Sequence, residues 1–262
     1  MQITTNEAFA RRRGLIGTLG TIVGFIVLGA GMFISIQQSS QPNASVTWVA
    51  IIPWFTLGVG IIALNVGKHY AMRYGTRPRV DQAIAQALKG YDNKNHLYNF
   101  VPGLPTEHLL VTPNRVVVLV GRPFFGEVIH HGRKWTRPVT ASGVLQRLTD
   151  GGLGNPTLEA EHETTAVQEL LEERLGAEVA KQIAVMPLIV LTNPRVKLQV
   201  SEPDVPVAKL SELKEALRRL KETPRLSPDL QRRLVRALQW DPRSDSEAVS
   251  SSRSKAWQRT QK

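Results

Sequence analysis

The amino-acid sequence predicts a helical transmembrane hairpin followed by a small α/β domain, in which helices flank a mixed β-sheet. Two observations lead to this fold class. Residues 14–36 and 46–66 contain no charged side chain, and each run reaches the roughly 20 apolar residues that cross a hydrocarbon core about 30 Å thick. Beyond residue 77, periodic patterns follow in the order helix, strand cluster, helix, two strands and helix, which is typical of a layered α/β domain.

Flanking charge predicts the orientation of the hairpin. The connector, residues 37–45, has no Lys or Arg, whereas basic residues border both outer ends: Arg11, Arg12 and Arg13 before the first span, and Lys68, Arg73, Arg77 and Arg79 after the second. Because positive charge is enriched on the cytoplasmic side of membrane proteins, we expect a two-span protein of the cell membrane with both termini in the cytoplasm. Residues 1–13 are then a cytoplasmic arm, and the connector is a short external loop.

Small residues indicate how the two spans pack. Gly20 and Gly24 form a GxxxG pair, which allows two helices to approach closely in lipid. The short connector makes the second span of the same chain the first candidate for the partner helix. A homodimer through the Gly20/Gly24 face is the alternative.

Composition excludes some kinds of functional site and favours some partners. The chain of 262 residues contains no cysteine, which excludes disulfides, zinc–thiolate sites and cysteine nucleophiles. Its formal net charge is +11, and a basic protein favours phosphate-rich partners, either nucleic acid or the anionic inner leaflet of a membrane. For a chain that is anchored in the lipid bilayer, attraction to the leaflet is the simpler explanation.

The soluble domain is predicted over residues 77–222, and a basic tail, helical and then disordered, over residues 223–262. Pattern and capping signals give the elements: a helix over 77–90, strands over 97–101, 107–111, 116–120 and 126–129, a loop over 140–154, a helix over 155–176, strands over 186–191 and 196–200, and helices over 211–220 and 227–240. Asn155-Pro156 gives the clearest helix start, since Asn is a preferred cap and Pro suits the first turn. In the tail, Arg232, Arg233 and Arg236 are candidate contacts for nucleic acid or lipid.

Several segments of the soluble region share a pattern with a known family. They are Glu107 to Val118 (EHLLVTPNRVVV), Gly126 with Trp135 beyond it, Asn155-Pro156 and residues 187–191 (PLIVL). In this order and spacing, residues 80–220 resemble the nuclease-related domain, NERD, whose fold is similar to the restriction-endonuclease core. That family shows an Asp-His strand, a Pro-Asn-Gly turn, a strand that ends in Glu-x-Lys, and then Asn-Pro-x-x-Gln.

The resemblance implies a site for Mg²⁺-dependent phosphodiester cleavage. In that fold, two carboxylates on adjacent strands hold Mg²⁺, which activates water, and a lysine stabilises the developing charge. By position, Glu107 corresponds to the first Asp and Glu159 to the Gln. Arg122 corresponds to the Lys, which keeps the charge but changes its shape. Val120 corresponds to the metal-binding Glu.

Val120 is the main departure from the family, because valine cannot bind a metal ion. The resemblance therefore implies a degenerate nuclease centre, in a membrane-tethered module that binds or scaffolds without catalysis. Two alternatives remain open. One is an active nuclease at the inner face of the membrane, with Glu107 and Glu159 as Mg²⁺ ligands and Arg122 beside them. The other is a membrane scaffold whose basic C-terminal region binds anionic lipid headgroups.

Overall fold

The computed structural model describes residues 1–39, 47–75, 78–138 and 153–240, and it divides the chain into two compact units. One unit is the segment Phe9–Arg79. The other combines Met1–Ala8 with the chain from Val80 onward. The first unit is therefore inserted, in sequence, near the start of the second.

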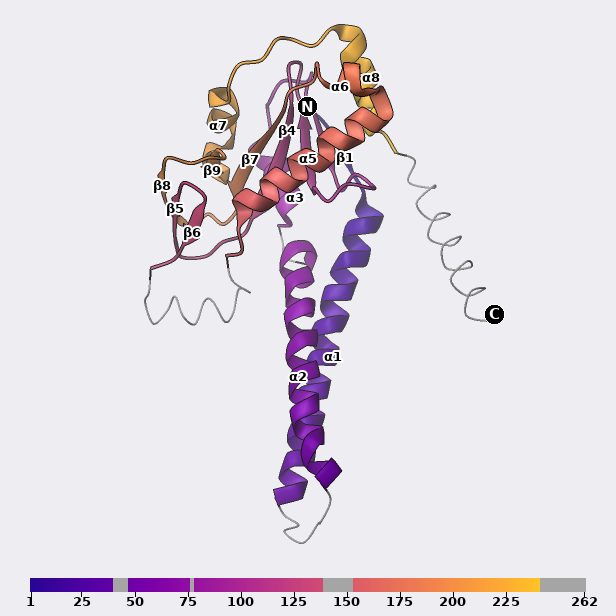
Figure 1. The fold of residues 1–262 in the computed structure, drawn as a ribbon, viewed down its shortest axis with the longest axis vertical. Helices are drawn as coiled ribbons and strands as arrows, with labels where there is room; N and C mark the ends of the chain where they lie inside the picture. Colours follow the sequence, from indigo (N-terminus) through magenta and orange to yellow (C-terminus); the bar gives the residue numbers. More distant parts are fainter. Residues whose placement is uncertain (40–46, 76–77, 139–152, 241–262) are drawn as a thin grey trace, which may run out of the picture. The chain divides into compact units, whose positions relative to one another are not determined.

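The inserted unit is a pair of long helices that lie side by side (Figure 1). Helix α1 spans Glu7–Ser39, α2 spans Thr47–Tyr70, and a π-helical segment, Ala71–Gly75, continues α2. Both long helices are apolar enough, by length and composition, to cross a bilayer, and only 11% of the apolar stretch of each is buried. Large apolar side chains are therefore exposed along the hairpin, such as Phe25 at 64% and Trp54 at 75%. A core helix of a soluble protein would bury such a surface.

Glycine allows the two helices to approach at backbone distance. A Cβ atom added to Gly17 would lie 2.4 Å from the backbone nitrogen of Ala71, and one added to Gly67 would lie 2.3 Å from that of Thr21. The same holds for Gly20 against Gly67 and for Gly24 against Leu64. The Gly20/Gly24 face, which the sequence analysis considered for either partner, packs here against α2 of the same chain.

The charged end of the hairpin is closed by an arginine among aromatic rings. The guanidinium of Arg13 lies 4.7 Å from the ring centre of Phe9, 5.4 Å from that of Tyr70 and 6.0 Å from that of Tyr74. Cation–π attraction of this kind contributes about 0.5–2 kcal/mol. It links the start of α1 to the end of α2, and amphipathic aromatic rings are common where a span meets the membrane interface.

The second unit is built on a six-stranded mixed sheet with the order β1-β2-β3-β4-β7-β9. Its strands are β1 (Gln2–Thr5), β2 (His96–Asn99), β3 (His108–Val111), β4 (Val116–Arg122), β7 (Val185–Leu191) and β9 (Val207–Lys209). Strands β2, β3 and β4 are antiparallel neighbours, whereas β1 is parallel to β2, β7 to β4, and β9 to β7. Every residue from Val116 to Gly121 is buried, which places β4 at the centre of the core.

Helices cover both faces of this sheet. One apolar core gathers beneath α5 (Pro156–Leu175), α6 (Ala177–Ala180) and α8 (Pro228–Leu238). The other lies beneath α3 (Val80–Ala87) and α7 (Leu213–Arg219), which follows the 3₁₀ turn Leu210–Glu212. At Gly121 the approach of α3 is so close that an added Cβ would lie 2.4 Å from Val80. The expected mixed sheet with flanking helices is therefore present.

A small second sheet, of order β6-β5-β8, lies beside the first (Figure 1). It contains β5 (Glu127–His131), β6 (Lys134–Thr136) and β8 (Lys197–Ser201). Strands β5 and β6 form a hairpin whose turn includes Gly132, which has a φ of 57°. This sheet packs near the N-terminal turn of α5 through contacts described below.

Two boundaries differ from the sequence analysis. Residues 1–13 are not an arm, because Gln2–Thr5 forms edge strand β1 and Asn6 donates to the carbonyl of Asn99 at 3.1 Å before α1 begins. Residues 223–240 are not a tail, because Leu230, Leu234 and Leu238 of α8 are buried in the core. The predicted loop 140–154 and the predicted disorder after Trp240 fall largely outside the described residues.

Candidate functional site

The positions that the resemblance assigns to a nuclease centre come from three places in the fold. Val118, Val120 and Arg122 alternate along β4 and so share a face, and Val118 and Val120 belong to the core beneath α5. Glu107 lies in a bend just before β3, whose Leu109 pairs with Val118. Glu159 lies on the covering helix, α5.

Glu107 and Val120 differ in what they can do. Glu107 is 9% exposed, and its backbone carbonyl accepts a hydrogen bond from the amide of Phe100 at 2.8 Å, which fixes the backbone just before β3. Val120 is 2% exposed and is part of the apolar core. The position that carries a metal-binding acid in the resembling family is therefore occupied here by a packed hydrocarbon.

The structure brings Arg122 and Glu159 together. Arg122 ends β4, Glu159 lies in the first turn of α5, and the guanidinium and carboxylate form a salt bridge with side chains 16% and 27% exposed. The helix start is fixed by Asn155, whose side chain accepts from the amide of Leu158 at 3.3 Å, with Pro156 in the first turn. The predicted cap is confirmed, and it places Glu159 beside the end of β4.

Further charged groups are buried nearby in the chain. Glu163, one helical turn after Glu159, is 3% exposed, and Arg137, just after β6, is 4% exposed with its guanidinium 5.9 Å from the ring centre of Phe124.

The surroundings of the predicted Mg²⁺ ligands differ from those in the resembling family. Mg²⁺ takes oxygen ligands, Val120 offers none, and the carboxylate of Glu159 contacts the guanidinium of Arg122. Within residues 1–39, 47–75, 78–138 and 153–240, no group of three or more His, Cys, Asp or Glu side chains is arranged to hold a metal ion. Arg122 and Glu159 form their ion pair where the end of β4 meets the first turn of α5.

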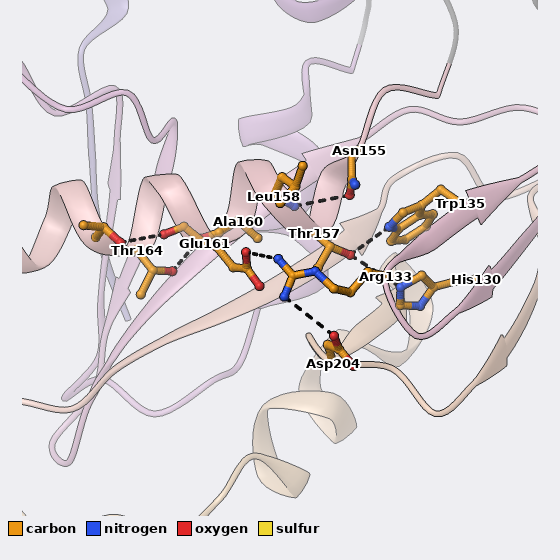
Figure 2. A network of polar contacts seen from close by, with 11 residues as sticks. His130, Arg133, Trp135, Asn155, Thr157, Leu158, Ala160, Glu161, Thr164 and Asp204 are labelled. Carbon is orange, nitrogen blue, oxygen red and sulfur yellow. Dashed lines mark hydrogen bonds and ion pairs between the residues drawn. The ribbon is translucent and has the colours of Figure 1, made fainter.

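A polar network that the sequence analysis did not predict joins the second sheet to α5 (Figure 2). The indole of Trp135 donates to the hydroxyl of Thr157 at 2.9 Å, and this hydroxyl lies 3.5 Å from Nε2 of His130. The rings of His130 and Trp135 stack with centres 4.1 Å apart. A hydroxyl that accepts from an indole retains its own proton to donate, so the arrangement suits a neutral imidazole with Nε2 as the acceptor.

An exposed set of charges supports the same junction. Arg133, in the β5–β6 turn, donates to Glu161 of α5 at 2.5 Å and lies 3.8 Å from the carboxylate of Asp204 (Figure 2). The turn between the two strands is thus tied to the helix and to the segment after β8. The sequence signals were Trp135 and the Asn155-Pro156 helix start, but no periodic pattern relates them across 20 residues of chain.

The three predicted basic residues lie on α8 but not in one environment. Arg232 and Arg236 line a cavity of about 410 Å³ between α8 and the start of β2, whereas Arg233 is exposed and is not among its lining residues. Arg232 lies 3.8 Å from Asp229 on the same helix. Arg232 and Arg236 therefore line the same cavity, and Arg233 lies outside it.

Comparison with known proteins gives no match. No protein-family model, no curated protein and no solved structure matches this chain. The fold and the site therefore define the protein by their own features: an α/β domain interrupted by an apolar helical hairpin, with an arginine–glutamate pair at the junction of β4 and α5.

We expect the Arg122–Glu159 pair to stabilise the domain. Glu159→Gln removes a charge that faces the partly buried Arg122, so the free energy of unfolding should fall by about 1–3 kcal/mol. The matched control is Glu161→Gln, whose ion pair with Arg133 is exposed, and whose loss should cost less than about 1 kcal/mol. Urea unfolding of the full chain in nanodiscs measures both, and equal losses would contradict a special role for Glu159.

We also expect stability to decrease in mild acid through His130. Burial lowers the pKa of His130 from its usual 6.5, while the Gly132 backbone and Asp204 oppose the shift. A lowered folded-state pKa means that the unfolded chain binds the proton first. Stability is therefore full above pH 6.5 and falls as the pH drops towards the folded-state pKa.

The test of this pH dependence compares two adjacent histidines. Thermal unfolding midpoints between neutral pH and mild acid should fall less steeply in His130→Gln than in the unaltered protein. The control is His131→Gln, because His131 is exposed and contacts Ser201 at 2.7 Å. A variant His130→Gln with an unchanged pH profile would contradict the prediction.

Proposed function

We propose that this protein is a membrane-anchored, nuclease-related module of the NERD type that binds or scaffolds without catalysing cleavage. Its core is then of the restriction-endonuclease kind. The burial of Val120 in the apolar core carries the proposal, because a metal-dependent nuclease needs an acid at that position. The salt bridge between Arg122 and Glu159 supports it further, since it engages the carboxylate that a rebuilt metal site would require.

The order of the elements is compatible with this relationship. The antiparallel pair β3–β4 is followed by α5 and then by β7, which returns parallel to β4. In this order of elements, Val120 and Arg122 lie on β4, Glu159 lies on the covering helix, and Glu107 comes just before the neighbouring strand β3. The motifs that carry the resemblance follow the same order along the chain, which supports the proposal.

The membrane anchor of the proposed protein is the helical hairpin. Strand β1 pairs with β2 in the domain sheet, and the chain re-enters the domain at α3 after the second long helix. If the hairpin inserts into a bilayer, both of its outer ends must therefore lie on the same side of the membrane as the domain. The basic residues at both of these ends favour the cytoplasmic side.

The catalytic part of the proposal is tested with the full chain in nanodiscs, because a fragment that begins after the hairpin would lack β1. We expect neither saturable Mg²⁺ or Mn²⁺ binding nor metal-dependent cleavage of single- or double-stranded DNA or RNA. Glu107→Ala is the matched control. Metal-dependent cleavage that disappears in Glu107→Ala would contradict the proposal and favour an active nuclease.

The anchor and its orientation are tested by single cysteines, since the chain has none of its own. In intact cells, a membrane-impermeant maleimide should label Asn43→Cys in the connector. It should label Lys134→Cys, on exposed strand β6, after permeabilisation. Labelling of Lys134→Cys in intact cells would show the opposite orientation, and recovery of the protein in the soluble fraction would exclude the anchor.

A further inference from the structure

A positively charged region of the domain, separate from the candidate site above, lies between β2 and α8. The cavity of about 410 Å³ there has Lys94 and His96 on the strand side, with Gln231, Arg232, Arg236 and Gln239 on the helix side. We call it the basic groove. Val235 also lines it; none of its described lining residues is Asp or Glu, and Asp229, 3.8 Å from Arg232, lies outside the lining.

The helix side of the basic groove is fixed in place. Leu230, Leu234 and Leu238 anchor α8 in the core, and Ser227 caps its first turn by accepting from the amide of Leu230 at 3.2 Å. At the other end, Arg174 of α5 donates to the carbonyl of Ala237 at 2.6 Å. The arginines therefore project from a backbone whose position is set before any ligand arrives, which reduces the ordering cost of binding.

The strand side of the groove carries Lys94 and the ring of His96, which rests on the buried ring of Tyr98. The rings of His96 and Tyr98 stack with centres 6.1 Å apart and planes 11° apart, and Tyr98 lies 6.3 Å from the ring of Trp240. Burial, together with the nearby N-terminal ammonium, lowers the pKa of His96, and burial raises the pKa of Tyr98 to about 12. The positive charge of the groove therefore comes from Lys94, Arg232 and Arg236.

The spacing of these cations suits a compact anion of high charge. Arg232 and Arg236 are four residues apart on one helix, so their stems are about 6 Å apart, and each guanidinium offers a planar fork of donors. Lys94 faces them from the turn before β2, and two glutamine amides add neutral donors. A monocarboxylate would leave most of this charge uncompensated, whereas a phosphomonoester carries about −1.5 to −2 at neutral pH.

We propose that the basic groove binds a phosphomonoester or diphosphate group. The ligand can be the headgroup of an anionic lipid or a soluble phosphorylated molecule, since both present the same chemistry to the two arginines. This inference goes beyond the proposed function and does not depend on it. The groove lies at the His96 end of β2, and Glu107 lies beyond the Asn99 end, which pairs with His108.

Binding is measured by calorimetric titration of inorganic pyrophosphate into the full chain in phosphatidylcholine nanodiscs, at about 150 mM salt so that exposed charges are screened. We expect one saturable site. Arg232→Ala and Arg236→Ala should each weaken binding about tenfold or more, because each removes charge-assisted hydrogen bonds. Lys94→Ala, on a different element, should also weaken it.

The matched control is Arg233→Ala, which removes the same charge from the same helix outside the groove and should leave the affinity within about twofold. Each variant is checked by thermal unfolding, and all four side chains are exposed or lie at the surface of the domain. Absence of saturable pyrophosphate binding would overturn the proposal. So would an equal loss in Arg233→Ala and Arg236→Ala, because binding would then reflect net charge alone.

A second arm separates the two sources of phosphate. Nanodiscs that contain phosphatidate should weaken pyrophosphate binding by competition if the headgroup occupies the groove. Unchanged affinity in these nanodiscs would assign the groove to a soluble phosphorylated ligand. Both outcomes support a phosphate site, and both are independent of the Glu107→Ala cleavage assay, so failure of one proposal is distinguishable from failure of the other.

Discussion

The pairing of β1 with β2 is the constraint on which the rest of the structure depends. Four residues at the start of the chain complete the edge of the domain sheet, and a single residue, Asn6, separates them from the first long helix. The hairpin is therefore an insertion in the domain rather than an extension before it. Because the chain must return to α3 to build the remaining sheet, the hairpin has to bring its two outer ends back together. The glycine contacts between α1 and α2, and the aromatic rings around Arg13, hold those ends close.

The sequence predicted the elements whose signals are local. The two apolar runs, the β-branched strand 116–120 and the Asn155-Pro156 helix start all appeared near their expected positions, because length, branching and capping act within a few residues. Strand β1 was missed, since Gln2–Thr5 has too few residues for a period and gains its stability from a partner 94 residues away. Helix α8 was predicted as a helix but assigned to a tail, although its buried leucines recur every four residues.

The candidate site shows the same division between local and distant information. Motif order singled out Glu107, Val120, Arg122 and Glu159, and the fold has Val120 and Arg122 on β4, Glu159 on the covering helix and Glu107 just before β3. The motif could not predict which of these and other polar side chains contact one another. Arg122 and Glu159 lie 37 residues apart and form an ion pair, and Trp135 and His130 meet Thr157 across 22 and 27 residues. Such pairings depend on how the second sheet packs against α5, and no spacing in a single sequence encodes that geometry.

The insertion also determines how the domain responds to proteolysis. A protein with an ordinary N-terminal anchor is shed from the membrane by one cut in its linker. Here, a cut between α2 and α3 would leave β1 covalently joined to α1 and still hydrogen-bonded to β2. The cleaved domain would remain attached to the helical hairpin through four paired residues and the hydrogen bond that the amide of Asn6 donates to Asn99. Release would require β1 to separate from β2 as well. The rate of release would therefore depend on how often this edge strand leaves the sheet, and not on peptide hydrolysis alone.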